Sequence, residues 1–276
     1  MNTLKTALLL GLLSILLIYT GGFIGGSQGA TIFFLIALAM NFSSYWWSDK
    51  IVLAMYRAQP IEEKSAPELF RMVQSLTDNA GIPMPRLYLI PDMRPNAFAT
   101  GRNPNNAVVA VTQGILKMLN TEELKGVIAH ELSHIKNRDI LIGSVAATIA
   151  ATITLLARVV GYSAMFGGGN DRREGGNPLL MMILAPIAAM IIQMAVSRSR
   201  EFQADASAAQ LIGSPNGLAS ALRKLEISAQ TYPMHGGSSS TAHLFIVNPF
   251  RSSLFQNLFS THPSTEERIK RLLAVH

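Results

Sequence analysis

The sequence predicts a mainly α-helical membrane protein with a small β-sheet and an inserted apolar helical hairpin. The composition is 49% hydrophobic and only 14% charged, and the mean hydropathy is +0.28. An ordinary soluble domain is about a quarter charged. The apolar residues gather in long stretches, which favours membrane spans over one large core. The polar segments between these stretches show helical periodicity and short strand-like runs.

The first two apolar stretches predict an N-terminal transmembrane hairpin within residues 1–50. Residues 6–24 follow a lysine, and residues 30–47 end in the run Tyr-Trp-Trp. About 20 apolar residues span a bilayer, and aromatic rings at the end of a span suit the headgroup layer. A signal peptide begins in the same way, but no clear small-x-small cleavage site is present. We therefore expect two spans, with the glycine-rich turn outside and both ends inside.

Residues 51–139 read as the first part of a soluble domain. The segment SAPELFRMVQSLTDNAGI has apolar residues at helical spacing and a glycine after its end. The run RLYLI predicts a short strand. The runs NAFATG and AVVAVT predict a hairpin, because the turn-forming RNPNN lies between them. A further helix is expected to have Thr121 as its cap and acidic residues in its first turn.

Residues 140–196 hold the third and fourth apolar stretches, which we predict to form an inserted transmembrane hairpin. Both stretches contain polar residues, which inside a span usually face protein or water. Residues 197–276 read as the second part of the soluble domain. They contain three helical patterns, and the last of these, STEERIKRLLAV, begins with a capping box.

Charge and cysteine content exclude several classes of function. The formal net charge is +6, but the basic residues are scattered and mixed with acids, so we expect no nucleic-acid partner. A basic face next to anionic lipid accounts for the excess. The chain has no cysteine, which excludes disulfide scaffolds, cysteine nucleophiles and thiolate metal sites. Any metal site must therefore use histidine and carboxylate side chains.

The segment HELSH combines His130, Glu131 and His134 on one predicted helix. Residues four apart share a helix face, so both imidazoles can reach one metal ion. Glu131 is turned by about 100° from His130 and can reach a metal-held water without being a ligand. The metal would acidify that water and the glutamate would take its proton. The alternative, two polar residues on an exposed face, fits poorly because this helix is largely apolar.

A catalytic zinc usually has three protein ligands and one water. The residues after His134 offer no third histidine at the usual spacing, so the third ligand is Glu, Asp or a distant His. Glu201 and Asp205 lie four apart on one predicted helix, and such a pair can supply a ligand and a carboxylate that orients a histidine ring. A salt-bridged surface, with Arg198 and Arg200 beside Glu201, is the alternative. If the apolar insert is a hairpin, its two ends lie at one membrane face, where Glu201 can meet the histidines.

Four motifs together resemble those of HtpX-type membrane zinc metalloproteases, which are bacterial relatives of the CAAX-prenyl endopeptidases. The motifs are VIAHELSHIKNRD, SRSREFQADASAA, PNAFATG and THPSTEERI, and they occur in the family's order over essentially the whole chain. The resemblance implies a helical, zincin-like metalloprotease domain. It implies one zinc ion per chain held by His130, His134 and Glu201, with Glu131 as the catalytic acid and base.

The resemblance also implies a multi-pass protein of the bacterial inner membrane whose active site faces the cytoplasm. We expect it to act in quality control of damaged membrane proteins, with membrane-protein or unfolded-protein substrates and a lipid bilayer as partners. The oligomeric state stays open. An intramembrane-cleaving metalloprotease is the first alternative, and the charges that flank HELSH disfavour it. The second is a membrane scaffold or transporter with structural zinc, which would need a fourth ligand.

Further residues are candidates for handling the substrate. The run NAFATG is the candidate edge strand for binding an extended peptide, and an ordinary hairpin strand is the alternative. The candidate residues of this strand are Asn96, Ala97, Phe98, Ala99 and Thr100. His262 and Arg268 are candidates for stabilising the tetrahedral oxyanion, by resemblance to the family's C-terminal HP…R segment. A structural role for each is the alternative.

Overall fold

The computed structural model describes residues 2–143, 145, 149, 198–231, 246 and 263–274. The third and fourth apolar stretches therefore lie almost entirely outside the described residues. The helices are α1 Asn2–Met55, α2 Pro67–Ala80, α3 Gln113–Met118, α4 Thr121–Lys136, α7 Arg198–Ile212, α8 Asn216–Thr231 and α10 Thr265–Ala274, and short 3-10 turns cover Glu63–Ser65 and Pro104–Asn106. The strands are β1 Gln59–Pro60, β2 Arg86–Ile90, β3 Ala97–Gly101 and β4 Ala107–Thr112.

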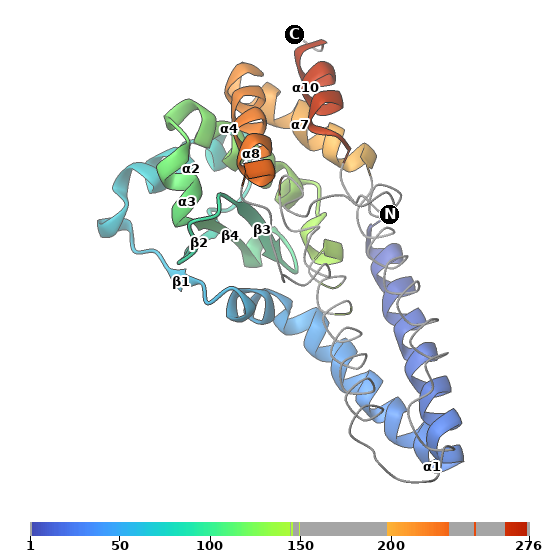
Figure 1. Cartoon of the computed structure of the whole chain (residues 1–276). Coiled ribbons are helices and arrows are strands. Elements are labelled where there is room, and N and C mark those ends of the chain that lie inside the picture. Colours follow the sequence, from blue (N-terminus) through green and yellow to red (C-terminus); the bar gives the residue numbers. More distant parts are fainter. Residues whose placement is uncertain are drawn as a thin grey trace.

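Helix α1 folds back on itself between two apolar halves (Figure 1). Its backbone leaves helical geometry at Gly25 and Gly26, and Gly26 has a φ of 58°, which glycine adopts without strain. Between the halves, the Asn41 side-chain amide donates a hydrogen bond to Ser14 Oγ at 2.8 Å. Polar contacts of this kind hold apolar helices together in an apolar surrounding.

Helix α1 also contains the segments expected to cross the membrane. By length and composition, the described residues include one helix suited to crossing, Gly25–Met55, and a shorter apolar helix, Leu4–Tyr19. The expected span 30–47 lies within the longer helix. The expected span 6–24 overlaps the shorter helix, and that this helix crosses the membrane stays a prediction.

Among the described residues, four strands form one sheet in the order β1-β2-β4-β3. Strand β4 runs parallel to β2, with Val109 opposite Leu87, and antiparallel to β3, with Ala110 opposite Phe98. The predicted pairing of NAFATG with AVVAVT is thus confirmed. All residues of β4 are buried, because this central strand is covered on both faces. Strand β3 is left at the edge of the sheet.

Helices cover both faces of the sheet. Val108 packs with Val52 at the end of α1, whereas the next residue, Val109, belongs to the main core with α2, α4 and α8. The alternation follows from the strand geometry, which points successive side chains to opposite faces. An ion pair between Arg86 and Asp49, 2.7 Å long, also fastens β2 to α1. The end of α1 and the sheet therefore form one packed unit.

Helix α4 begins with a cap that differs from the expected one. Thr121 is the first helical residue, and Asn120 is the N-cap, so the prediction of Thr121 as the cap is wrong. The Asn120 side chain accepts from the Glu123 N–H, and the Glu123 carboxylate accepts from the Asn120 N–H, each at 2.9 Å. Glu123 also accepts hydrogen bonds from Ser220 and Lys224 of α8, both at 2.7 Å. The capping box therefore also ties α4 to α8.

Two glycines allow α4 and α8 to cross closely. A Cβ on Gly126 would lie 2.6 Å from the backbone nitrogen of Leu218, and one on Gly217 would lie 2.4 Å from the carbonyl oxygen of Glu122. Real Cβ atoms do not approach backbone atoms so closely. The crossing therefore requires glycine at both positions and buries the helix that carries HELSH.

Replacing Gly126 with alanine is expected to destabilise the protein by about 1–3 kcal/mol, because the added methyl overpacks the crossing. The control is Gly143, a helical residue whose Cβ position has no contact within 4 Å among the residues that the structure describes. Gly143→Ala should leave stability unchanged or raise it, since alanine favours helix. Thermal unfolding in detergent, followed by circular dichroism, compares the two variants. Equal melting temperatures would contradict the close crossing.

Candidate metal centre

Helix α4 presents the two histidines of HELSH side by side. His130 and Glu131 are buried and His134 is half-buried. The two Nε2 atoms lie 3.2 Å apart, as expected for residues four apart on one helix face. The two rings are perpendicular, with centroids 4.8 Å apart.

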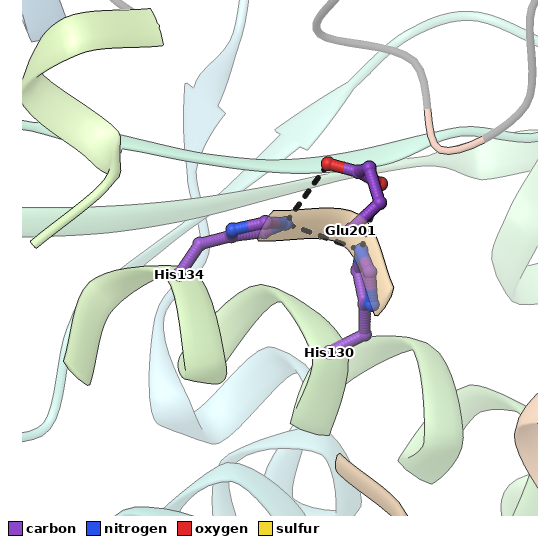
Figure 2. A group of neighbouring side chains, drawn as sticks. All are labelled: His130, His134 and Glu201. Carbon is purple, nitrogen blue, oxygen red and sulfur yellow. Dashed lines mark hydrogen bonds and ion pairs between the residues drawn. The ribbon is translucent and has the colours of Figure 1, made fainter. Parts of the chain in front are cut away.

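Helix α7 brings Glu201 to the same place (Figure 2). Its Oε1 lies 3.5 Å from His134 Nε2, and its Oε2 lies 3.6 Å from His130 Nε2. The three ligand atoms all lie within 4.8 Å of one another, and Glu201 is 5% exposed. The structure therefore brings together the three side chains that the sequence analysis selected from two distant segments.

The three side chains fit a metal ion. His130 Nδ1 lies 2.9 Å from Asp205 Oδ1, and an ionised carboxylate only accepts, so Nδ1 carries the proton and Nε2 carries the lone pair. In a buried place, a nitrogen lone pair and a carboxylate that face each other repel unless a proton or a metal cation lies between them. With metal–ligand bonds of 2.0–2.1 Å, the ligands of a tetrahedral zinc lie about 3.3–3.4 Å apart. The two nitrogens lie 3.2 Å apart and each lies 3.5–3.6 Å from the nearer oxygen of Glu201, and a set with one oxygen of Glu201 fits within 4.8 Å, so the group is close to the size that zinc requires.

Asp205 is itself held by Arg268 of α10. The Arg268 Nε donates to Oδ2 at 2.8 Å and Nη2 donates to Oδ1 at 2.7 Å. Burial acts to raise the pKa of Asp205, but the charge and hydrogen bonds of Arg268, together with His130, outweigh burial and lower the pKa to about 2. Asp205 therefore stays ionised, as a carboxylate that orients the His130 ring must be.

Arg268 has further internal contacts, and its Nη2 also lies 3.4–3.5 Å from the two ring nitrogens of His130. Its Nη1 donates to the Ile246 carbonyl at 2.8 Å and lies 3.7 Å from Glu201 Oε2, and the residue is 1% exposed. The guanidinium thus balances two carboxylates beside the ligand group, a task that the sequence analysis did not foresee. Its part in stabilising an oxyanion stays a prediction. The other oxyanion candidate, His262, lies outside the described residues.

Glu131 lies beside the two histidines and also contacts strand β3. Its Oε2 accepts a hydrogen bond from the Ala99 N–H at 2.8 Å. Burial raises the pKa of Glu131, and the nearby histidines and the Ala99 hydrogen bond offset this only in part. A carboxyl with a raised pKa binds a proton more readily, as a group that takes up and later donates a proton in catalysis must. Glu131 therefore suits an acid–base role.

Strand β3 contains four of the five residues selected for substrate binding, Ala97 to Thr100. The fifth, Asn96, precedes the strand: its N–H donates to Thr112 Oγ1 at 2.9 Å, and its side-chain oxygen accepts from the Ile246 N–H at 3.3 Å. Asn96 therefore anchors the start of the strand. On the side away from β4, the Ala99 N–H faces Glu131.

The sequence analysis missed one carboxylate at the site. Asp139 follows the end of α4, and its Oδ2 lies 3.3 Å from His134 Nδ1. The available signal was an acidic residue directly after a helix whose last turn holds a histidine. Burial acts to lower the pKa of His134, but the hydrogen bond with Asp139 and the charges of Glu201 and Glu131 outweigh it and raise the pKa to about 9.

Comparisons with known proteins agree with this geometry. The family model described as "Peptidase family M48" matches residues 63–276. A "Protease HtpX homolog" from Syntrophobacter fumaroxidans is 55% identical over 274 residues, which cover 97% of each chain. A relative of the same name from Persephonella marina is 57% identical over 278 residues, covering 99% of this chain and 96% of its own.

A solved structure has a similar fold. The crystal structure of S. mikatae Ste24p matches with a TM-score of 0.52 at 22% identity. The match covers 98% of this chain and 63% of the Ste24p chain, so this protein spans less than two thirds of that chain's length. The fold, the ligand group and the full-length relatives lead to one conclusion: the chain belongs to peptidase family M48, as a metallopeptidase of the HtpX type.

Proposed function

We propose that the protein is a membrane-anchored zinc endopeptidase that cleaves misfolded or damaged membrane proteins, in quality control and in the response to stress. The observation that carries this proposal is the convergence of two imidazole Nε2 atoms and the Glu201 carboxylate beside the buried Glu131. Two histidines and one glutamate are a known ligand set of catalytic zinc. Neither cysteine nor a fourth protein ligand is needed, which leaves a position for water.

The residues of the site divide the work between them. His130, His134 and Glu201 would hold one zinc ion, which supplies Lewis acidity when bound. Asp205 accepts the Nδ1 proton of His130 and so keeps Nε2 directed at the ligand group. Glu131 takes the proton of the attacking water and returns it to the leaving amine nitrogen as the peptide bond breaks. The burial that raises its pKa favours the second of these steps.

Strand β3 is the proposed support for the substrate. An extended peptide that pairs with the edge of β3 places its backbone next to Glu131, because Ala99 and Glu131 are in direct contact. The pairing segment runs from Ala97 to Thr100, since the N–H and the side chain of Asn96 are engaged elsewhere, and Glu131 must release the Ala99 N–H before a peptide can pair there. The predicted oxyanion roles of His262 and Arg268 complete this proposal.

The proposed place of the site is close to the cytoplasmic surface of the bacterial inner membrane. The support is the contact between the sheet and α1, where the Arg102 guanidinium lies 4.4 Å from the centre of the Trp46 ring. Tryptophan rings at the end of an apolar helix are typical of the headgroup layer. Loops of membrane proteins that emerge from the bilayer would meet the protease at this level.

Glu131→Gln is expected to lower the cleavage rate of an unfolded substrate such as casein by at least about 100-fold, because the general base is lost. Zinc content and melting temperature should stay at the wild-type level. Glu122→Gln, an exposed change on the same helix, is the matched control and should remain active. Cleavage by the Glu131 variant at the wild-type rate would overturn the mechanism.

The wild type is expected to contain one zinc ion per chain, and Glu201→Ala should lose most of it, because two histidines hold zinc more weakly than three ligands. Elemental analysis after dialysis measures this, with the exposed Glu266→Ala as the control that retains zinc. An unchanged zinc content in Glu201→Ala removes Glu201 from the ligand set.

The metal-free protein is expected to lose stability as the pH rises from about 6.5 to about 9. Folding raises the pKa of His134 from 6.5 to about 9, so the protonated ring favours the folded state. This contribution is fully present below pH 6.5 and disappears as the pH passes through 9. Melting curves of chelator-treated protein should show the decline, and His134→Gln should lack it. An equal slope in both proteins would speak against the raised pKa.

A further inference from the structure

The chain turns sharply at the end of α4. The Asp139 N–H donates to the His134 carbonyl at 2.9 Å, and the Arg138 N–H donates to the Ile135 carbonyl at 3.1 Å. This pair of bonds is the Schellman pattern of a helix end, which usually has glycine at the residue with positive φ. Here that residue is Arg138, with a φ of 58°. A side chain in this conformation is strained, and such strain persists where the surrounding structure fixes it.

The turn carries the Asp139 carboxylate back to the ring of His134. One oxygen, Oδ2, lies 3.3 Å from His134 Nδ1, and the other, Oδ1, lies 3.9 Å from Arg200 Nη1 on α7. Asp139 is only 9% exposed. The carboxylate therefore lies between an imidazole and a guanidinium in a place where solvent screens charges weakly.

We propose that Asp139 and Arg200 form a positioning pair for His134. The carboxylate accepts the Nδ1 proton, which fixes the tautomer and directs the Nε2 lone pair at Glu201 and His130. Arg200 holds the carboxylate in place and balances its charge. The inference rests on the proposed function in one respect, that His134 is a metal ligand.

The other histidine supports this reading, because it has the same kinds of partner at shorter distances. His130 Nδ1 contacts Asp205, and Arg268 grips Asp205 with two hydrogen bonds. Each ring thus has an aspartate at Nδ1 and each aspartate has an arginine. Helix α7 takes part in both sets, since it carries Arg200, Glu201 and Asp205. One helix therefore supplies a ligand and helps to orient both of the other ligands.

Asp139 also has a competing structural role. It precedes a helical turn that begins at Ile140, and its carbonyl accepts from the Gly143 N–H at 3.4 Å, so it could serve only as a cap. Asparagine caps a helix as well as aspartate does and has the same shape. Asp139→Asn therefore keeps the cap and removes the charge that faces His134. Asp139→Ser is a second capping variant, for use if the first does not fold.

The test is the zinc dissociation constant of the full-length protein in detergent, measured by competition with a chromophoric chelator. Asp139→Asn should raise this constant about tenfold or more, as is typical for the partner of a ligating histidine. Arg200→Gln should raise it by a smaller factor, and Arg200→Lys should restore most of the loss. Arg198→Gln, the same change of charge at an exposed position of the same helix, should bind zinc like the wild type.

A double variant separates the two possible targets of Arg200. If Arg200 acts through Asp139, Asp139→Asn with Arg200→Gln binds zinc no more weakly than Asp139→Asn alone. An undiminished effect of Arg200→Gln in that background would show that Arg200 acts through Glu201 and would overturn the pair. The absorption spectrum of the cobalt-substituted protein should change in Asp139→Asn and not in Arg198→Gln.

Failure of this inference differs from failure of the proposed function. If His134→Ala loses zinc while Asp139→Asn and Asp139→Ser both bind it like the wild type, the positioning role is overturned and the zinc peptidase stands. If the wild type itself binds no zinc, the proposed function fails and this inference fails with it.

Discussion

Three electron-rich groups converge in a buried place, and much of the described structure serves to hold them there. The two imidazole Nε2 atoms and the nearer oxygens of the Glu201 carboxylate lie 3.2–3.6 Å from one another, and with neither a proton nor a metal cation among them a low dielectric would strengthen their repulsion. The scaffold must therefore resist their separation. The glycine crossing and the Glu123 hydrogen bonds fix α4 against α8, while Arg268 fixes α7 against α10. A cation at the centre turns the same convergence into a favourable interaction.

The parts of this arrangement that could be predicted from the sequence are those set by local periodicity. Spacing alone places His130 and His134 on one helix face, and turn residues between two apolar runs give the hairpin of β3 and β4. Glu201 could be selected because no cysteine and no nearby histidine compete with it. The choice of Asn120 over Thr121 as the cap was also within reach of the sequence, because Glu123 lies three residues after Asn120, at the spacing of a capping box, whereas Leu124 lies three residues after Thr121. What the sequence does not show is that Glu123 also binds Ser220 and Lys224 of α8.

The contacts of Arg268 and Asp139 could not be predicted from the sequence, because they depend on tertiary structure. A basic residue in a C-terminal helix is ordinarily a surface residue, and nothing local indicates that Arg268 is buried against Asp205. Asp139 reaches His134 only because Arg138 adopts a left-handed conformation, which sequence propensity assigns to glycine.

The exposed Glu122 and Lys136 at the two ends of α4 also disfavour the intramembrane alternative, since charges of this kind are costly inside a bilayer.

The order of the ligands along the chain has a consequence for biosynthesis. The ribosome makes the two histidines first, then the long apolar insert, and only afterwards Glu201, with Arg268 near the C-terminus. A nascent chain that ends within this insert carries the histidine helix without Glu201 and without the hydrogen bonds from Arg268 to Asp205. The ligand group is complete once Glu201 has been made, whereas the contact of Asp205 with Arg268 needs a later segment of the chain. The ligand group therefore forms only after α7 has packed against α4, which joins two segments that are far apart in the sequence.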